Sequence, residues 1–142
     1  MPAGPGPIGF AAFTGVKFLG YSVAASVLAN FFQSSRNVWL VGLARTGIGL
    51  VAGALFGGTW ILLGTFFHRK WPDWAAALLF FGLLIPIRLA EWSLLIHFFF
   101  DRGLLERARD LKCAAVGGAW SFVLDAVGIV SAFVIPGGFW VC

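Results

Sequence analysis

Residues 44–57 read ARTGIGLVAGALFG and lie inside a long apolar stretch. Every fourth position carries either the one arginine or a glycine, in the order Arg45, Gly49, Gly53 and Gly57. On an α-helix this spacing places the four residues on one face, as a smooth stripe with a charge at one end. Because glycine allows close approach between helices in lipid, the stripe predicts a packed transmembrane helix.

The stripe is compatible with three kinds of contact. It can be a packing groove within one chain, a seam between copies of the chain, or the wall of a narrow permeation path. In the last apolar run, Gly128 shares a helix face with Ser121 and Asp125, so we expect it to serve helix packing as well.

The composition indicates a protein that lives in lipid. Hydrophobic residues make up 60% of the 142 residues, charged residues only 11%, and the mean hydropathy is +0.92. Soluble domains carry about 25% charged residues. Most basic residues lie between apolar runs, which is typical of membrane orientation and of contact with anionic lipids. Membrane lipids are therefore the expected partners, and nucleic acid is not.

Four apolar runs predict an all-α, four-helix transmembrane bundle with short loops, formed by one domain over residues 1–142. A span needs about 20 apolar residues. The expected spans are residues 10–32, 38–66, 74–100 and 113–135, with a flexible leader at 1–8 and a charged loop at 101–112. The helical pair spacing of Glu106 and Arg109 also allows a short surface helix within that loop.

Several single residues predict local features of these helices. Asn37 and Asp73 directly precede apolar runs, as N-cap residues do. Pro86 removes a backbone hydrogen bond in the third run, so we expect a kink there. Lys17 lies near the start of the first run, and its long side chain is expected to reach the membrane interface.

The basic residues also indicate an orientation. One side of the membrane receives the larger group, which consists of Arg36, Arg102, Arg107, Arg109 and Lys112. Because positive loops stay in the cytoplasm, loops 33–37 and 101–112 are expected to be cytoplasmic and both termini outside.

Four ionisable residues lie well inside the apolar runs: Arg45, Arg88, Glu91 and Asp125. Charges at such positions are costly and normally face protein or water. At 1.5 Å per residue, measured from the side of loops 33–37 and 101–112, Arg45 lies about 10 Å deep and Glu91 about 13 Å. Arg88 and Asp125 both lie about 18 Å deep by the same measure. The depths predict the pairs Arg45–Glu91 and Arg88–Asp125, joined into one network because Arg88 and Glu91 are three residues apart.

This polar intramembrane network has two interpretations. It can be structural, fixing the register of the helices, or it can be a polar site that relays protons or ions or holds an anionic group. His97 and Ser121 are the possible proton or ligand contacts beside it. The spacing of His, Cys and carboxylates indicates no metal site, and we expect no cofactor.

Three function classes follow. The first is an accessory or self-assembling membrane subunit, working as a homo-oligomer or within a larger membrane complex. The second is a small oligomeric transporter or channel that uses the mid-membrane charges. The third is a membrane enzyme or binder acting on a lipid-linked substrate. The sequence assigns no catalytic residue, because it contains neither a phosphate-binding glycine loop nor a nucleophile motif, and this disfavours an enzyme.

Overall fold

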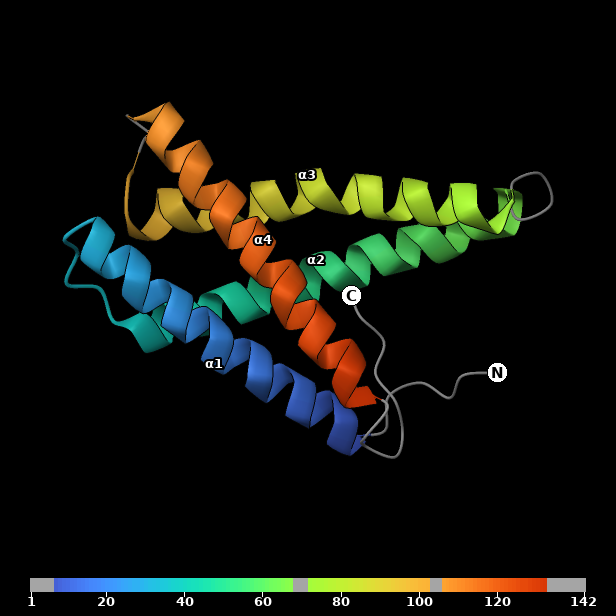
Figure 1. Ribbon diagram of the computed structural model, residues 1–142, viewed down its shortest axis with the longest axis horizontal. Coiled ribbons are helices and arrows are strands. Elements are labelled where there is room, and N and C mark those ends of the chain that lie inside the picture. The colour runs from blue at the N-terminus through green and yellow to red at the C-terminus, as the bar shows by residue number, and fades with distance from the viewer. Residues whose placement is uncertain (1–6, 68–71, 103–105, 133–142) are drawn as a thin grey trace.

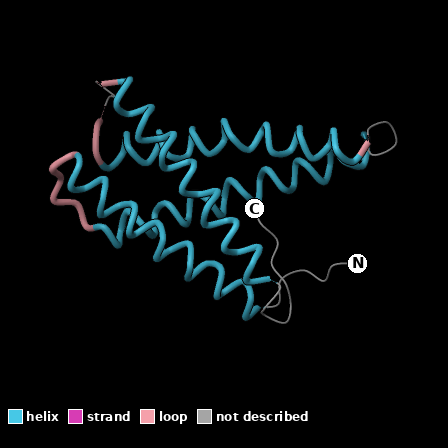
Figure 2. Tube along the Cα trace, in the orientation of Figure 1, coloured by secondary structure: helices cyan, strands magenta, loops and turns pink. Residues whose placement is uncertain are grey.

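The fold is all-α, as predicted. The computed structural model describes residues 7–67, 72–102 and 106–132, and Figure 2 shows helices and connecting loops but no strand in these ranges. The four helices, labelled in Figure 1, are α1 (Pro7–Phe31), α2 (Val38–Phe67), α3 (Asp73–Phe99) and α4 (Arg107–Ala132). Most of the expected leader and the end of the fourth expected span lie outside the described residues.

Three helices are long and apolar enough to cross a membrane: Gly9–Phe31, Val38–Gly64 and Trp74–Phe99. With 26 residues α4 is of similar length, but its described part includes five charged residues, Arg107, Arg109, Asp110, Lys112 and Asp125. A charged residue within a span costs at least about 2.5 kcal/mol at the helix centre. The fourth crossing therefore stays a prediction.

The helix starts show which capping predictions hold. The Oδ1 atom of Asn37 accepts hydrogen bonds from the amides of Trp39 at 3.0 Å and Leu40 at 3.4 Å, so the predicted N-cap of α2 is confirmed. The prediction for Asp73 is wrong: the N-cap of α3 is Pro72, and no side chain caps it. The extended backbone of Pro72, with ψ at 149°, already takes that position, and Asp73 becomes the first helical residue. α3 continues through Pro86 without a break, and the kink stays a prediction.

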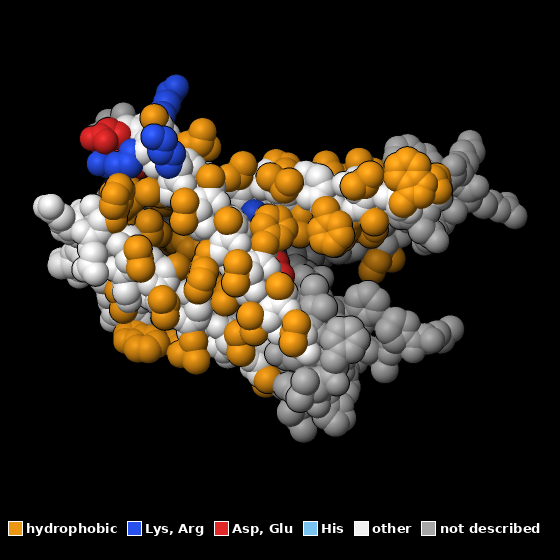
Figure 3. All heavy atoms as spheres, in the orientation of Figure 1, with side chains coloured by type: hydrophobic (Ala, Val, Ile, Leu, Met, Phe, Trp, Pro, Cys, Tyr) orange, Lys and Arg blue, Asp and Glu red, His pale blue; other side chains and the backbone are white. Residues whose placement is uncertain are grey.

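The second half of the charged segment 101–112 belongs to α4, which begins at Arg107. The amides of Arg109 and Asp110 donate to the carbonyl of Glu106 at 2.9 and 3.0 Å, which starts the helix before the apolar run begins. Charged side chains gather at this end of the bundle (Figure 3), and Arg107 is exposed there, so helical backbone does not force its charge out of water.

The helices meet at one end and diverge at the other. α1 packs chiefly against α2, and α4 against α3. In Figure 1 the loop between α1 and α2 lies at the same end as the passage from α3 to α4, and the Phe32 and Phe100 rings are 5.5 Å apart there. Away from this loop end, α2 and α3 run side by side as one arm, while α1 and α4 run in another direction. The molecule is therefore V-shaped.

The buried core lies where the four helices meet. It consists of Tyr21, Ala25, Leu28, Val41, Trp92, Leu95, Ile96, Ala114 and Leu124. The outer half of the α2–α3 arm instead exposes large apolar side chains, including Leu55, Ile61, Leu62, Leu78, Phe81 and Ile85. Apolar side chains also cover much of the face seen in Figure 3. Such surfaces are suited to lipid rather than water.

Two close approaches between helices occur at glycines outside the stripe. A Cβ atom at Gly42 would overlap Ser22 of α1, and one at Gly117 would overlap the Trp92 ring of α3. At Gly49 a Cβ would come within 3.1 Å of Arg45 Nη1, on its own helix.

A role in helix packing stays a prediction for Gly53, Gly57 and Gly128. Gly53 is buried and Gly57 is half-buried in α2. The surroundings of Gly128 lie outside the part that the structure describes.

Candidate functional site

Five charged side chains from all four helices form one continuous chain of alternating sign: Lys17, Asp125, Arg88, Glu91 and Arg45. Lys17 Nζ lies 2.6 Å from Asp125 Oδ1, and Arg88 Nη2 lies 2.9 Å from Asp125 Oδ2. Arg88 Nη1 and Arg45 Nη2 then share Glu91 Oε2, at 3.1 and 2.7 Å. None of these residues is more than 7% exposed. We call this set the charge chain.

The two pairs expected from helix depth, Arg45–Glu91 and Arg88–Asp125, are both present. Lys17 is the member that the sequence analysis missed. Instead of reaching the interface it is buried against Asp125, because a carboxylate within the bundle offers its ammonium group a closer partner than distant water. Lys17 lies about 21 Å from the loop end at 1.5 Å per residue, close to the depth of about 18 Å expected for Asp125. This similarity in depth was the signal in the sequence for the contact.

Two aromatic residues and a serine surround the Arg45 end of the charge chain. Ser121 Oγ accepts hydrogen bonds from Arg45 Nη2 at 3.2 Å and Trp92 Nε1 at 2.9 Å, and donates to the Gly117 carbonyl at 3.1 Å. The Arg45 guanidinium carbon lies 4.7 Å from the centroid of the Tyr21 ring and 5.1 Å from the Trp92 ring. The aromatic faces thus stabilise the cation where it is cut off from water.

The charge chain is not electrically neutral. It contains three cationic side chains and two carboxylates, so its formal charge is +1. The four residues predicted from the sequence, two cations and two carboxylates, did not include Lys17. Excess charge in a low-dielectric interior is costly because little water remains to solvate it.

His97 packs beside Phe98, with their ring centroids 5.2 Å apart. Its role as a proton or ligand contact stays a prediction, as does that of Ser121. Within the described residues, no group of three or more His, Cys, Asp or Glu side chains is placed to hold a metal ion.

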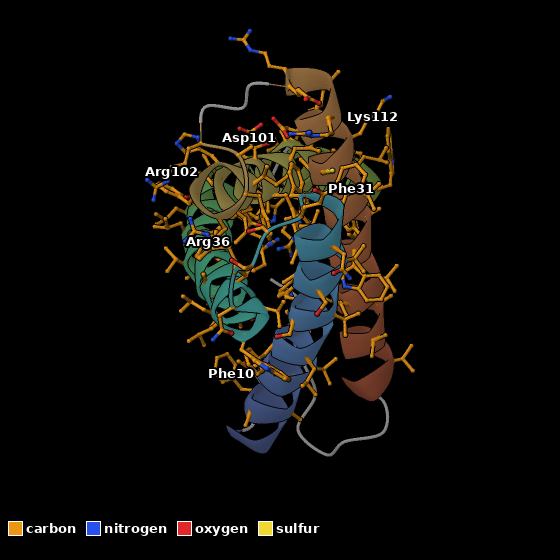
Figure 4. All side chains as sticks on the ribbon, turned by 90° about the vertical axis from the view of Figure 1, so that its left-hand side faces the viewer. Phe10, Phe31, Arg36, Asp101, Arg102 and Lys112 are labelled. Carbon is orange, nitrogen blue, oxygen red and sulfur yellow. The ribbon has the colours of Figure 1, made fainter. Side chains whose placement is uncertain are left out.

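A second polar group surrounds a cavity of about 400 Å³ at the loop end. The cavity is lined by Phe31, Phe32, Gln33, Phe100, Asp101, Glu106 and Arg109. Gln33 adopts a left-handed conformation with φ at 49°, where the chain leaves α1. In the end view of Figure 4, Arg36, Arg102 and Lys112 point outward around Asp101. The sequence analysis missed this cavity because its walls come from segments far apart in the chain.

Arg109 joins the acidic residues at this cavity. It lies 3.3 Å from Asp101 and 3.1 Å from Glu106, and its guanidinium carbon is 4.7 Å from the Phe32 ring centroid. Beside it, burial and the neighbouring Asp101 carboxylate raise the pKa of Asp110 above its usual value.

Chemically, the charge chain can do two things. It can hold four helices in one register through charge-assisted hydrogen bonds, or it can exchange protons between neighbouring groups that lie within hydrogen-bond distance. Resemblance to known proteins does not separate these roles, since comparisons with protein families, curated proteins and solved structures found no match to this chain.

Proposed function

We propose that this protein is an accessory or self-assembling membrane subunit, in which the charge chain sets the register of four helices. The supporting observation is that every helix contributes a charged side chain to one alternating series, with each neighbouring pair within 3.1 Å. The apolar exterior of this rigid unit would then meet lipid, other copies of the chain, or a larger membrane complex.

Helix geometry explains why such a series would select one arrangement. Moving one helix by a single turn displaces its side chains by about 5.4 Å, which exceeds the reach of a hydrogen bond. Any shifted register would leave charges buried without a partner, and breaking a buried pair costs about 3–5 kcal/mol. Specificity of this kind is the best-attested role of buried ion pairs.

A transporter or channel is the second candidate, and one observation favours it. From Arg45 to Lys17 the charge chain extends over depths of about 10 to 21 Å, at 1.5 Å rise per residue. Alternating acids and bases along the membrane normal are suited to relaying protons or ions. No observation within the described residues favours the enzymatic hypothesis.

Replacing one buried carboxylate distinguishes the two candidates. The test variant is Glu91→Gln, and its control is Glu106→Gln, whose side chain is 65% exposed. Both proteins would be purified in mild detergent, sized by light scattering, melted, and reconstituted in liposomes for proton and anion flux. For a packing subunit, we expect Glu91→Gln to lower the melting temperature and disrupt complexes larger than one chain, while the control behaves as wild type.

Two results would contradict the packing proposal. One is a wild-type protein that stays a single chain and copurifies with nothing from its native membrane. The other is wild-type flux that disappears in a folded Glu91→Gln protein, which would identify a transporter.

A further inference from the structure

We propose that the cavity at the loop end binds the ammonium group of an ethanolamine phospholipid headgroup. The proposal concerns a different part of the molecule from the charge chain, and it does not depend on the proposed subunit function. Three features support it: the level of the cavity in the membrane, its aromatic and acidic walls, and the cations around its rim.

The cavity lies where two apolar helices end. Gly9–Phe31 and Trp74–Phe99 are long and apolar enough to cross a membrane. At their ends, the cavity is lined by Phe31, Phe32 and Phe100. The hydrocarbon core of a bilayer is about 30 Å thick, and the lipid headgroups begin directly outside it. Residues at the end of a span therefore lie at the level of the headgroups, which makes a headgroup the nearest and most abundant ligand for this cavity.

The aromatic rings form a surface suited to a cation. The Phe32 ring centroid lies 5.4 Å from that of Phe31 and 5.5 Å from that of Phe100. Phe32 already contacts one cation, since the Arg109 guanidinium carbon lies 4.7 Å from its ring centroid. The negative faces of aromatic rings attract ammonium and guanidinium groups. This wall is therefore of the kind that binds an organic cation.

The charges at the cavity favour a cation over an anion. Arg109 meets three carboxyl groups, at 3.3 Å from Asp101, 3.1 Å from Glu106 and 3.8 Å from Asp110. Burial raises the pKa of Asp110, but a proton there still leaves two carboxylates against one guanidinium. Those two, Asp101 and Glu106, line the cavity. A primary ammonium group can donate hydrogen bonds to both, whereas a quaternary ammonium has no N–H to donate.

The size and the rim of the cavity fit the rest of the headgroup. Its volume of about 400 Å³ lies in the usual range for small-ligand sites. Arg36 follows the cavity residue Gln33 by three positions, and Arg102 directly follows Asp101. Both arginines are exposed and point outward around this end (Figure 4), where a phosphate can pair with them. Phosphatidylethanolamine carries both groups, an ammonium for the acidic wall and a phosphate for the rim.

Lipid nanodiscs that contain the full chain test the proposal. Thermal unfolding would be measured in phosphatidylcholine, with a rising fraction replaced by phosphatidylethanolamine, and the retained lipids would be identified by native mass spectrometry. We expect the melting temperature to rise by several degrees and to saturate, and phosphatidylethanolamine to be retained in preference to phosphatidylcholine. Soluble ethanolamine added to phosphatidylcholine nanodiscs should have no such effect.

Two variants and their controls locate the effect at the cavity. Glu106→Gln and Phe31→Leu change side chains that are 65% and 59% exposed, so both proteins should fold as wild type does in detergent. Glu106→Gln should weaken the lipid dependence by about tenfold, as the loss of a hydrogen bond between charged groups predicts, and Phe31→Leu should weaken it less. The controls are Asp73→Asn, at the opposite end of α3, and Phe98→Leu, which removes a ring of equal exposure outside the cavity lining. Both should keep the wild-type lipid dependence.

Wild-type midpoints that do not change with phosphatidylethanolamine, with no preferential retention of this lipid, would overturn the inference. Equal losses in Phe31→Leu and Phe98→Leu would also overturn it, because the lipid would then act outside the cavity. A matching response to soluble ethanolamine would contradict the lipid as the source of the ammonium group. None of these results bears on the Glu91→Gln experiment. Conversely, a wild type that responds to the lipid but forms no complex would refute only the proposed subunit function.

Discussion

At the scale of single residues, Asp125 is the member of the charge chain that joins α1 and α4 to the diverging arm of α2 and α3. Its two carboxylate oxygens lie 2.6 Å from Lys17 on α1 and 2.9 Å from Arg88 on α3. Since Asp125 is itself 4% exposed, it has no access to bulk water that could replace either partner. Removing its charge should therefore destabilise the fold more than removing the charge of a residue with one partner.

We predict that Asp125→Asn destabilises the protein by about 3–5 kcal/mol, the cost of breaking a buried ion pair, and by more than Lys17→Gln does. The reason is that Asp125→Asn leaves two buried cations facing a neutral group, whereas Lys17→Gln leaves Asp125 bound to Arg88. Reversible unfolding in mixed detergent micelles measures both. The double variant should cost less than the sum of the single changes, and strict additivity would contradict the contact between the two residues.

The raised pKa of Asp110 predicts how the stability of the loop end depends on pH. Burial and the Asp101 carboxylate raise its pKa above the usual 3.8, so the folded state holds this proton more tightly than the unfolded state does. This contribution to stability is complete below pH 3.8 and decreases as the pH rises through the raised pKa. We therefore expect Asp110→Asn to raise the melting temperature at neutral pH.

The same variant should flatten the decline of stability between pH 4 and neutrality, by about the contribution of one titrating group. Glu106→Gln, which changes an exposed carboxylate in the same cluster, is the matched control. An Asp110→Asn protein that melts below wild type at neutral pH would show that the ionised carboxylate is stabilising, against this prediction.

At the scale of elements, glycines on different helices serve different purposes. Gly42 and Gly117 lie where a neighbouring helix leaves no room for a side chain, Ser22 on α1 in the first case and Trp92 on α3 in the second. Each glycine thus belongs to one of the two main helix pairs, α1–α2 and α3–α4. The stripe on α2 instead begins beside a buried arginine.

We predict that Gly42→Ala and Gly117→Ala each destabilise the protein by about 1–3 kcal/mol, the usual cost of overpacking. Gly47→Ala and Gly82→Ala are the controls, because a Cβ at either position would meet nothing within 4 Å. Melting temperatures of the four proteins in one detergent measure the difference. Equal effects at all four positions would mean that helix propensity, and not close packing, decides the outcome.

At the scale of the whole molecule, the V shape concentrates both the packing and the charges in one half of the bundle. The core and the charge chain lie toward the loop end, whereas the outer part of the α2–α3 arm presents apolar side chains outward (Figure 3). Arg36, which precedes α2, and Asp101 and Arg102, which follow α3, lie at that end (Figure 4).

We predict that Arg36 and Arg102 face the same, cytoplasmic side of the membrane and that Arg69, which follows the second expected span (38–66), faces the other. Each would be replaced by cysteine in a chain lacking Cys113 and Cys142, and labelled in intact cells with a reagent that does not cross membranes. The Arg69→Cys protein should be labelled fully and the other two only after permeabilisation. Labelling of Arg36→Cys and Arg102→Cys from opposite sides would contradict the arrangement at the loop end.

Much of the charge chain could be predicted from the sequence, because the helical rise converts residue number into depth and burial requires opposite charges at equal depth. The sequence therefore predicted four helices, the Arg45–Glu91 pair and the Arg88–Asp125 pair. Only the tertiary structure decided that Lys17 turns toward Asp125 and not toward the interface, that Gly42 and Gly117 lie at close approaches between helices, and that α2 and α3 diverge from α1 and α4. These features depend on the rotation and tilt of each helix, which are set by packing against its neighbours and not by any one helix alone.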